Sequence, residues 1–316
     1  MDERARPLEI GLGMPTFEAY LDGGRVPRWS ELLRFAQRAE ELGYDALWMP
    51  DHMVIEGEEE GERVGLWDAF SLLAALAACT TRIRLGPLVA CSGFRNPALL
   101  AKTADTIDEI SGGRLILGLG AGYYEFEYAA FGFPADRKVA RFEEALAIIH
   151  GLLRHGRVDV KGRWYSAQDC ELRPRGPTVG GPPLLIGAIT DAPRMLGLVA
   201  RYADLWTAWA VNSVEQVPPL RAAVDAACHE VGRDPATLQR TVAVLLDLPG
   251  SEAPTPFAAA LRSRRCPPAT GSVHELAELF RGLAREGISH AIVYVQPTGV
   301  DGVEAFAEVL ELLDAG

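Results

Sequence analysis

The chain has few cysteines and no long apolar run. Its 5 cysteines are odd in number, lie far apart and include no C-x-x-C pair, which argues against a disulfide framework or a cysteine zinc site. No stretch approaches the about 18 uncharged apolar residues of a membrane-spanning helix, and the start MDERARPLEIG lacks the apolar core of a signal peptide. We therefore expect a protein of the reducing cytoplasm that does not enter a membrane.

Positive charge is also scarce. Lys and Arg number 31 against 43 Asp and Glu, a formal charge of −12 and an isoelectric point near 5.1. Such a balance disfavours binding to nucleic acid or to anionic membranes, so an anionic ligand would have to be held locally. The 48% of hydrophobic residues provide a large core, and 23% charged residues are too few for a disordered chain.

Several catalytic motifs are missing. The sequence has no G-x-S-x-G nucleophile elbow and no G-x-x-x-x-G-K-[ST] phosphate loop. Its 6 histidines are scattered and form neither H-x-H nor H-E-x-x-H. These absences argue against serine hydrolysis of the α/β-hydrolase type, against P-loop chemistry and against a metal-dependent hydrolase, so we expect no metal site.

What is present is a regular alternation of short apolar runs, typical of buried parallel strands, with longer amphipathic runs, typical of covering helices. The expected strands are 8–13, 46–50, 83–89, 114–120, 183–187, 204–208, 241–248 and 290–296. The expected helices are 29–43, 66–80, 97–111, 137–156, 191–203, 214–232, 272–287 and 303–316. Eight such rounds without a linker predict one (β/α)₈ barrel domain over residues 1–316 rather than an open, doubly wound sheet. Residues 158–183 are too long for a plain loop and predict a β-hairpin excursion before the fifth strand.

In a barrel of this kind the loops that follow the strands converge on the active site. His52 follows the second strand, and a histidine combines a near-neutral pKa with donor and acceptor nitrogens, so it is the candidate for proton transfer. A solvated or capping histidine is the alternative. Asp51 could orient His52, accept a hydrogen bond from a cofactor ring, or cap the loop.

Glycine and other small residues follow the fourth and fifth strands. The run from Gly118 to Gly122 resembles G-x-G-x-G but lacks the acidic residue of a dinucleotide fingerprint, so its use would be to let a flat ring or a ribityl chain approach the backbone. After the fifth strand, Asp191 and Pro193 open a helix whose free N–H groups could hold a phosphate. An ordinary βα turn is the alternative.

Three other features carry weaker hypotheses. Cys91 could be a nucleophile, although a small buried hydrophobe is the better interpretation. The acidic run between Glu56 and Glu62 is typical of a solvated loop tip. Residues 249–271, on the active side of the seventh strand, could be a lid or a surface loop without function.

Longer segments resemble the bacterial luciferase-like superfamily of flavin- and deazaflavin-dependent oxidoreductases, over nearly the whole chain. The segments that carry the resemblance are EELGYDALWMPDH, LAACTTRIRLGPLV, RNPALLAKTADTIDEISGGRLILGLGAGYYEFEYAAFG, RFEEALAII and PPLLIGAITDAPRMLGLVARYADLW. The resemblance implies an enzyme whose barrel binds reduced flavin mononucleotide (FMN) or the deazaflavin coenzyme F420 across the strand ends. It also implies a bulge with a non-prolyl cis peptide at about Leu88, Val89 and Ala90, and phosphate contacts at Gly187 and Ala188.

The Asp51-His52 pair matches deazaflavin-dependent members of the superfamily, in which the histidine lies near the reacting carbon. The resemblance therefore favours hydride transfer between F420 and a small organic substrate, with His52 as catalytic residue. Combined with the loop positions, it gives these cofactor-binding candidates: Asp51, Leu88, Val89, Ala90, Ser92, Gly120, Ala121, Gly122, Tyr123, Gly187, Ala188, Ile189 and Thr190.

Other functions stay open. The alternatives are a monooxygenase that uses reduced FMN and a non-catalytic carrier of a flavin or deazaflavin. Two acidic residues of members that oxidise sugar phosphates and alcohols are replaced here by the region 14–16 and by Tyr123, so those substrates are not indicated. An alkanesulfonate is also disfavoured, because the basic residues that would hold it cannot be placed. Family members are commonly homodimers through their second and third helices, here 66–80 and 97–111.

Overall fold

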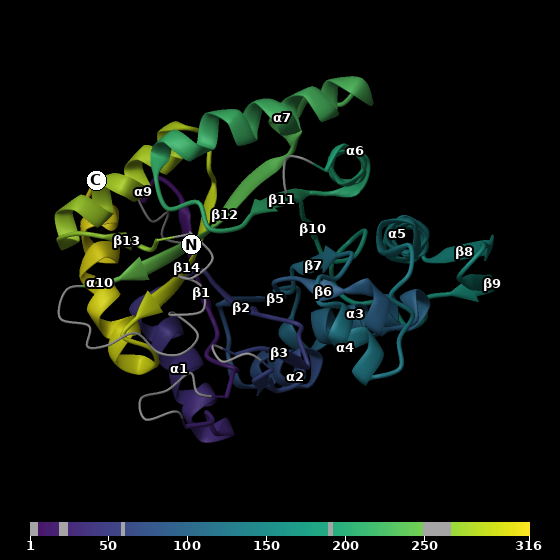
Figure 1. The fold of residues 1–316 in the computed structure, drawn as a ribbon, viewed down its shortest axis with the longest axis horizontal. Helices are drawn as coiled ribbons and strands as arrows, with labels where there is room; N and C mark the ends of the chain where they lie inside the picture. Colours follow the sequence, from purple (N-terminus) through teal and green to yellow (C-terminus); the bar gives the residue numbers. More distant parts are fainter. Residues whose placement is uncertain (1–5, 19–24, 58–60, 189–191, 249–266) are drawn as a thin grey trace.

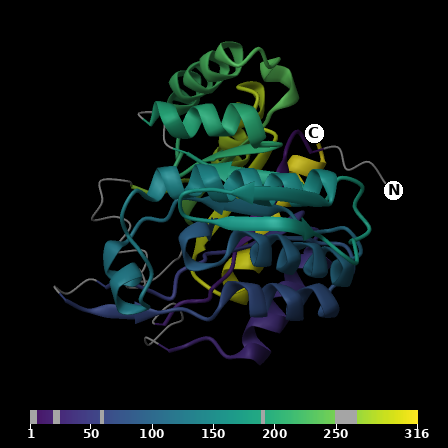
Figure 2. The same cartoon turned by 90° about the vertical axis from the view of Figure 1, so that its right-hand side faces the viewer.

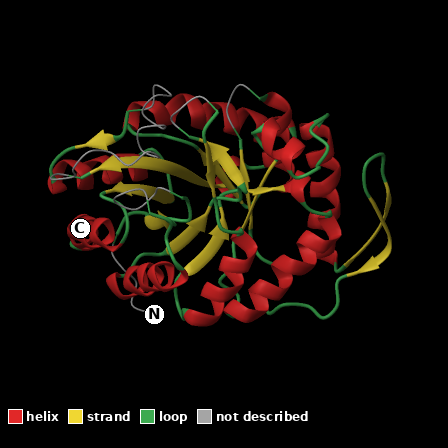
Figure 3. Ribbon diagram, turned by 60° about the horizontal axis from the view of Figure 1, so that its bottom comes forward, coloured by secondary structure: helices red, strands yellow, loops and turns green. Residues whose placement is uncertain are grey.

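The computed structural model describes residues 6–18, 25–57, 61–188, 192–248 and 267–316. Strands form a central, mostly parallel sheet that curls into a barrel, with helices around its outside (Figures 1 and 3). Within the described residues, no helix is long and apolar enough to cross a membrane.

All eight predicted strands are present in the barrel. They are β1 (Glu9–Gly13), β2 (Ala46–Met49), β5 (Arg84–Pro87), β7 (Leu117–Gly120), β10 (Leu184–Gly187), β11 (Leu205–Ala208), β12 (Gln239–Asp247) and β14 (His290–Gln296). Their spatial order is β5-β2-β1-β14-β12-β11-β10-β7, and every pair is parallel. The barrel closes where Leu85 of β5 bridges Leu115 just before β7, with hydrogen bonds to Arg114 and Ile116 of 3.1 and 2.8 Å. The predicted (β/α)₈ barrel is therefore confirmed.

Helices follow the strands as the periodicity predicts. They are α1 (Trp29–Leu42), α2 (Ala69–Cys79), α3 (Pro97–Ser111), α5 (Lys138–His155), α6 (Pro193–Tyr202), α7 (Val217–Glu230), α9 (Val273–Arg285) and α10 (Val300–Asp314). Local sequence fixes several of their ends. Asn96 caps α3 by accepting from the Ala98 and Leu99 amides, and Ser272 forms a capping box with Glu275 at the start of α9. Gly43 ends α1 at a φ of 87°, a left-handed conformation that favours glycine.

The excursion before the fifth strand is a hairpin of β8 (Arg157–Lys161) and β9 (Ser166–Glu171), as predicted. It projects from the barrel beside α5 (Figures 1 and 2). The periodicity did not predict four smaller elements, all short. They are the hairpin of β3 (Val54–Glu56) and β4 (Arg63–Gly65), the strand β6 (Ala90–Cys91), the strand β13 (Ala269–Thr270) and the six-residue helix α4 (Glu125–Ala130).

Alternate residues of each strand face opposite sides of the barrel wall. In β11, Leu205 belongs to the apolar cluster inside the barrel, whereas Trp206 packs with the outer core beneath the helices. The inner cluster also includes Trp48, Ile292 and Tyr294, with Leu88 and Val89 packed against it. Apolar side chains therefore fill the barrel, and the site is confined to its ends.

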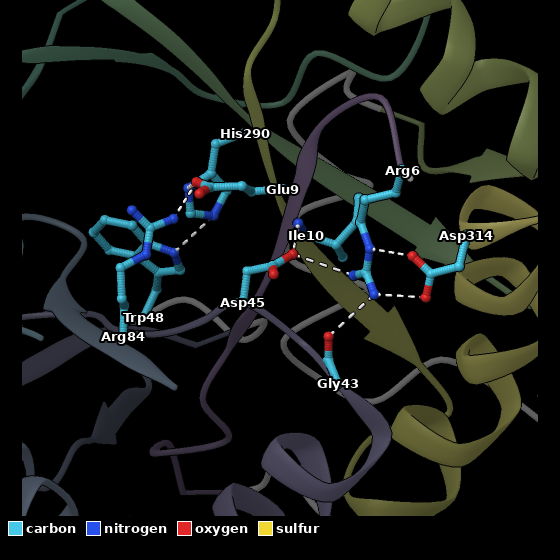
Figure 4. Close-up of polar contacts among 9 residues, drawn as sticks. All are labelled: Arg6, Glu9, Ile10, Gly43, Asp45, Trp48, Arg84, His290 and Asp314. Atoms are coloured by element: carbon cyan, nitrogen blue, oxygen red, sulfur yellow. Dashed lines mark hydrogen bonds and ion pairs between the residues drawn. The ribbon is translucent and has the colours of Figure 1, made fainter. Parts of the chain in front are cut away.

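Polar side chains close the end of the barrel at which the strands begin (Figure 4). His290 is 1% exposed, and its Nε2 accepts a hydrogen bond of 3.4 Å from Trp48 Nε1. Its Nδ1 lies 3.4 Å from a Glu9 carboxylate oxygen, and the same carboxylate pairs with Arg84. Burial lowers the pKa of His290 to about 3, so this histidine is neutral.

Arg6 ties the first described segment to the last helix. Its guanidinium donates to both carboxylate oxygens of Asp314, at 2.7 and 2.8 Å, and to Asp45 at 3.2 Å. Asp45 in turn accepts from the Ile10 amide at 2.7 Å, as Figure 4 shows. This network joins β1 to α10 and to the turn after α1.

Candidate active site

His52 lies three residues beyond the end of β2, at the end of the barrel opposite to His290. Its Nδ1 is 2.8 Å from Oε2 of Glu127, and its side chain is 29% exposed. The Tyr124 ring packs edge-on against the imidazole at a centroid distance of 5.3 Å. Among the described residues Nε2 has no hydrogen-bond partner, so this nitrogen is available to a ligand.

Glu127 is the functional residue that the sequence reasoning missed. It lies on α4 and is fully buried, although a carboxylate is costly to bury without partners. Its Oε1 accepts from the Met53 and Val54 amides at 2.8 and 3.1 Å, so the one side chain fixes the loop that carries His52. A charged residue within the aromatic stretch from Tyr123 to Phe133 is the feature that could have marked it.

Asp51 is buried and bound to Arg95. Its two carboxylate oxygens accept from Arg95 at 2.6 and 2.8 Å, and one of them also accepts from the Cys91 amide at 2.9 Å. Burial raises the pKa of the Asp51 carboxyl, and the Arg95 guanidinium opposes that effect. The hydrogen bond that orients His52 comes from Glu127, so Asp51 instead joins the loop after β2 to the loop after β6.

The bulge after β5 contains the expected cis peptide. The Leu88-Val89 bond is cis, which confirms the location given by the family resemblance. The Val89 side chain lies beside two glycines of neighbouring strands. A Cβ on Gly120 would come within 2.7 Å of Val89 Cγ2, whereas a Cβ on Gly187 would be 3.5 Å from the same atom. The Val89 side chain therefore covers Gly120, whereas Gly187 is partly exposed and an added Cβ there would make only ordinary contacts.

Tyr128, next to Glu127 on α4, supports the turn after β7. Its hydroxyl donates to the Ala121 carbonyl at 2.9 Å and lies 3.0 Å from the Cys91 thiol. Gly122 has a φ of 85°, and a Cβ there would clash with the Tyr128 hydroxyl. Burial raises the pKa of Cys91 to about 11, which confirms that this thiol behaves as a small buried hydrophobe. Tyr123, at 67% exposure, extends into solvent beside the Tyr124 ring.

The structure describes only part of the segment that follows β10. Ala188 is 8% exposed, and its amide donates to the Thr207 carbonyl at 3.3 Å, while Ile189, Thr190 and Asp191 lie outside the described residues. Thr207 occurs two residues after Leu205 and so shares its inward face. Its hydroxyl is buried without a hydrogen-bond partner, next to Gly187 in the sheet. The Thr207 atom nearest to an added Cβ on Gly187 is the methyl carbon Cγ2, at 3.6 Å, so this part of the wall is apolar.

Ala90 lies in β6 and Ser92 directly follows that strand; they are buried, at 0% and 2% exposure. Most of residues 249–271, the segment interpreted as a lid or a surface loop, lies outside the described residues.

A depression of about 430 Å³ lies at the other end of the barrel, between the ends of α6 and α7. Its cations are already engaged. Arg233 donates to the Ala200 and Ala203 carbonyls, and Arg201 pairs with Glu143. His150 and Asp204 also line it, but Asp204 pairs with Arg154 at 2.6 Å, so the strand-end rim is the better candidate for a reaction site.

The fold and this rim define a class of protein: a (β/α)₈ barrel with a carboxylate-bound histidine at the ends of its strands. The family model described as luciferase-like monooxygenase matches residues 9–248. The chain belongs to this family.

Relatives with assigned activities match over shorter stretches. A 5,10-methylenetetrahydromethanopterin reductase of Archaeoglobus fulgidus is 33% identical over 177 residues, 56% of this chain and 48% of the relative. An F420-dependent glucose-6-phosphate dehydrogenase of Amycolatopsis mediterranei is 34% identical over 163 residues, 48% of each protein. The chain thus spans about half the length of the curated relatives it matches.

Solved structures resemble the whole chain. An F420-dependent secondary alcohol dehydrogenase superposes with a TM-score of 0.79 at 18% identity, covering 97% of this chain and 99% of that one. EDTA monooxygenase of Chelativorans sp. BNC1 gives 0.80 at 16% identity, covering 98% and 94%. At these identities the likeness concerns the fold.

Proposed function

We propose that this protein is an oxidoreductase that transfers hydride between coenzyme F420 and a small organic substrate. The observation that carries the proposal is the contact of 2.8 Å between His52 Nδ1 and Glu127, which leaves His52 Nε2 open at the rim. Relatives named as F420-dependent dehydrogenases support the choice of cofactor.

The rim fits such a cofactor. Gly187 is partly exposed, and the atoms beside it are methyl groups of Val89 and Thr207, which together with the bulge at Leu88 and Val89 offer an apolar support for a ring. A bound deazaflavin supplies or accepts the hydride. His52 would hold or release the accompanying proton at Nε2, and Glu127 keeps its loop in place. The backbone at Gly120, Ala121 and Gly122, with Ala188, Ile189 and Thr190, would hold the rest of the cofactor.

A titration of the purified protein with each cofactor tests this proposal. We expect micromolar binding of F420, followed by fluorescence quenching, and weaker binding of FMN. Binding of FMN without binding of F420 would overturn the choice.

The alternative is a monooxygenase that uses reduced FMN. The similarity to EDTA monooxygenase favours it as the second candidate. Oxygen consumption in the presence of a flavin reductase distinguishes the two functions, because a deazaflavin lacks the N5 atom of ordinary flavin oxygen chemistry. A pocket that binds cofactor without any turnover would instead indicate a non-catalytic carrier.

We further propose a cytoplasmic homodimer in which each chain forms one barrel domain over residues 1–316. Cys79, Cys91, Cys170 and Cys228 are free thiols, which fits a reducing compartment. The outer face of α3 exposes Leu99 and Ile110 at 61% and 44%, which fits burial against a second copy. Light scattering of the full chain tests this assembly, and a monomeric mass at micromolar concentration would contradict it.

A further inference from the structure

Glu127 holds the loop after β2 with its two oxygens in separate roles. Oε1 accepts from two main-chain amides, those of Met53 and Val54, whereas Oε2 faces only His52 Nδ1. The main-chain groups can only donate, so their partner oxygen must accept. With no exposed surface, Glu127 cannot exchange these partners for water.

We propose that Glu127 is a positioning residue that fixes the protonation pattern of His52, with the proton on Nδ1 and the free electron pair on Nε2. Both oxygens of a carboxylate are acceptors, so Oε2 of Glu127 accepts from the ring nitrogen that faces it, as Oε1 accepts from the two main-chain amides. The ring nitrogen that faces Oε2 therefore donates. In neutral imidazole the other nitrogen is then an acceptor.

The position of the proton on His52 determines which ring nitrogen can exchange a proton with the substrate. This consequence rests on the proposed function. On oxidation, the proton that the substrate loses would go to Nε2, while a bound deazaflavin would take up the hydride. In the reverse direction the imidazolium would return the proton from Nε2 to the substrate. The Nδ1 proton stays on His52 in both directions, held by Glu127.

Replacement by glutamine reverses the pattern without changing shape. In Glu127→Gln the two main-chain amides require the amide oxygen at the Oε1 position. The NH₂ group then occupies the Oε2 position and donates to Nδ1, so the proton of neutral His52 moves to Nε2. A purely structural role for Glu127 predicts no such reversal.

The experiment is ¹⁵N NMR of the full chain labelled at histidine, without cofactor. His52→Gln assigns the resonances by their loss, and spectra are compared at the high-pH plateau, where the ring is neutral. We expect a protonated Nδ1 and a bare Nε2 in the wild type, and the opposite in Glu127→Gln. Glu125→Gln is the matched control, since Glu125 is exposed on the same helix, and should leave His52 unchanged.

A wild-type spectrum with the proton on Nε2 overturns the proposal, as does a Glu127→Gln spectrum identical to that of the wild type. The wild-type spectrum serves as a test even where the variant does not fold. The F420 titration separates this result from the function. Failure to bind F420 with the expected NMR pattern rejects the proposed activity and keeps the role of Glu127.

Discussion

The two ends of the barrel each hold a histidine beside a carboxylate, yet only one end is suited to chemistry. At the closed end, His290 is 1% exposed and the carboxylate beside it, Glu9, is paired with Arg84. At the open end, Arg95 pairs with Asp51. Glu127 accepts hydrogen bonds from two uncharged main-chain amides and contacts His52. A positively charged arginine bound to a carboxylate offsets the attraction of that carboxylate for a protonated histidine. The two ends of the barrel therefore differ in which carboxylate the arginine binds.

Solvent access makes the second difference. The polar neighbours described for His290 are the strand residues Trp48 and Glu9, whereas His52 lies on a loop that α4 holds through Glu127. Burial makes protonation of His290 unfavourable, and a group that cannot be protonated near neutrality cannot transfer protons there. The five predictions that follow test this contrast.

His52→Ala should have the largest effect. If His52 transfers the proton, turnover with F420 should fall by roughly 10²- to 10⁴-fold, the usual contribution of general acid-base catalysis. The melting temperature should fall as well, because the change leaves Oε2 of the buried Glu127 without its partner, so turnover is compared per folded molecule. Steady-state kinetics and a thermal melt check both points. Unimpaired turnover would remove His52 from the mechanism.

Gly187→Leu should weaken cofactor binding by at least about tenfold, because its side chain would fill the open space beside Thr207 and Val89. The nearest atoms to an added Cβ are 3.5 Å away, so the fold should tolerate the change. Fluorescence titration with F420 measures the effect. Gly197→Ala on α6 is the control and should bind F420 as the wild type does. Equal affinity in Gly187→Leu would place the cofactor elsewhere.

His290→Ala should reduce the free energy of unfolding by roughly 2–4 kcal/mol, the cost of a cavity in a packed interior, and leave turnover per folded molecule unchanged. Urea denaturation followed by circular dichroism gives the value.

The pH dependence of stability should change as well. Because the pKa of His290 is lowered from 6.5 to about 3 in the fold, the unfolded chain takes up the proton first as the pH falls. The wild type should therefore lose about 1.4 kcal/mol per pH unit through this group between pH 6.5 and 3, and keep its full contribution above pH 6.5. His290→Ala should lack that component, and parallel curves for both proteins would refute it.

Arg6→Met should have the smallest effect, a loss of about 1–2 kcal/mol in the free energy of unfolding, since its aliphatic stem packs as before while its charged hydrogen bonds are lost. The site is remote, so F420 affinity should not change. A fall in affinity would show that the closed end is coupled to the open end.

The apolar periodicity of the sequence predicted the helices and strands that bury an apolar face over many residues. Strand β14 and helix α9 are examples, since an unbroken apolar run and a capping box identify them without any tertiary contact. Helix α4 could not be predicted in this way. Its six residues are too few to show a period, and it is held by Glu127 and Tyr128, whose partners Met53 and Cys91 lie 74 and 37 residues away in the chain.

The same distinction applies to the candidate site. Position after a barrel strand was enough to mark His52, Gly120 and Gly187, because parallel strands bring all their carboxyl ends to one rim. The sequence could not show which carboxylate contacts His52, because Asp51 is adjacent in sequence and Glu127 is 75 residues away. Adjacent residues of an extended chain point in different directions, so the neighbour in sequence was free to bind Arg95.

The sequence by itself determined the barrel, the order of its strands and the end at which chemistry can occur, because these depend on apolar periodicity and on chain direction. Only the tertiary structure decided which carboxylate pairs with which cation and which histidine meets solvent. Those outcomes depend on distances of about 3 Å between segments that the chain brings together only when the barrel closes.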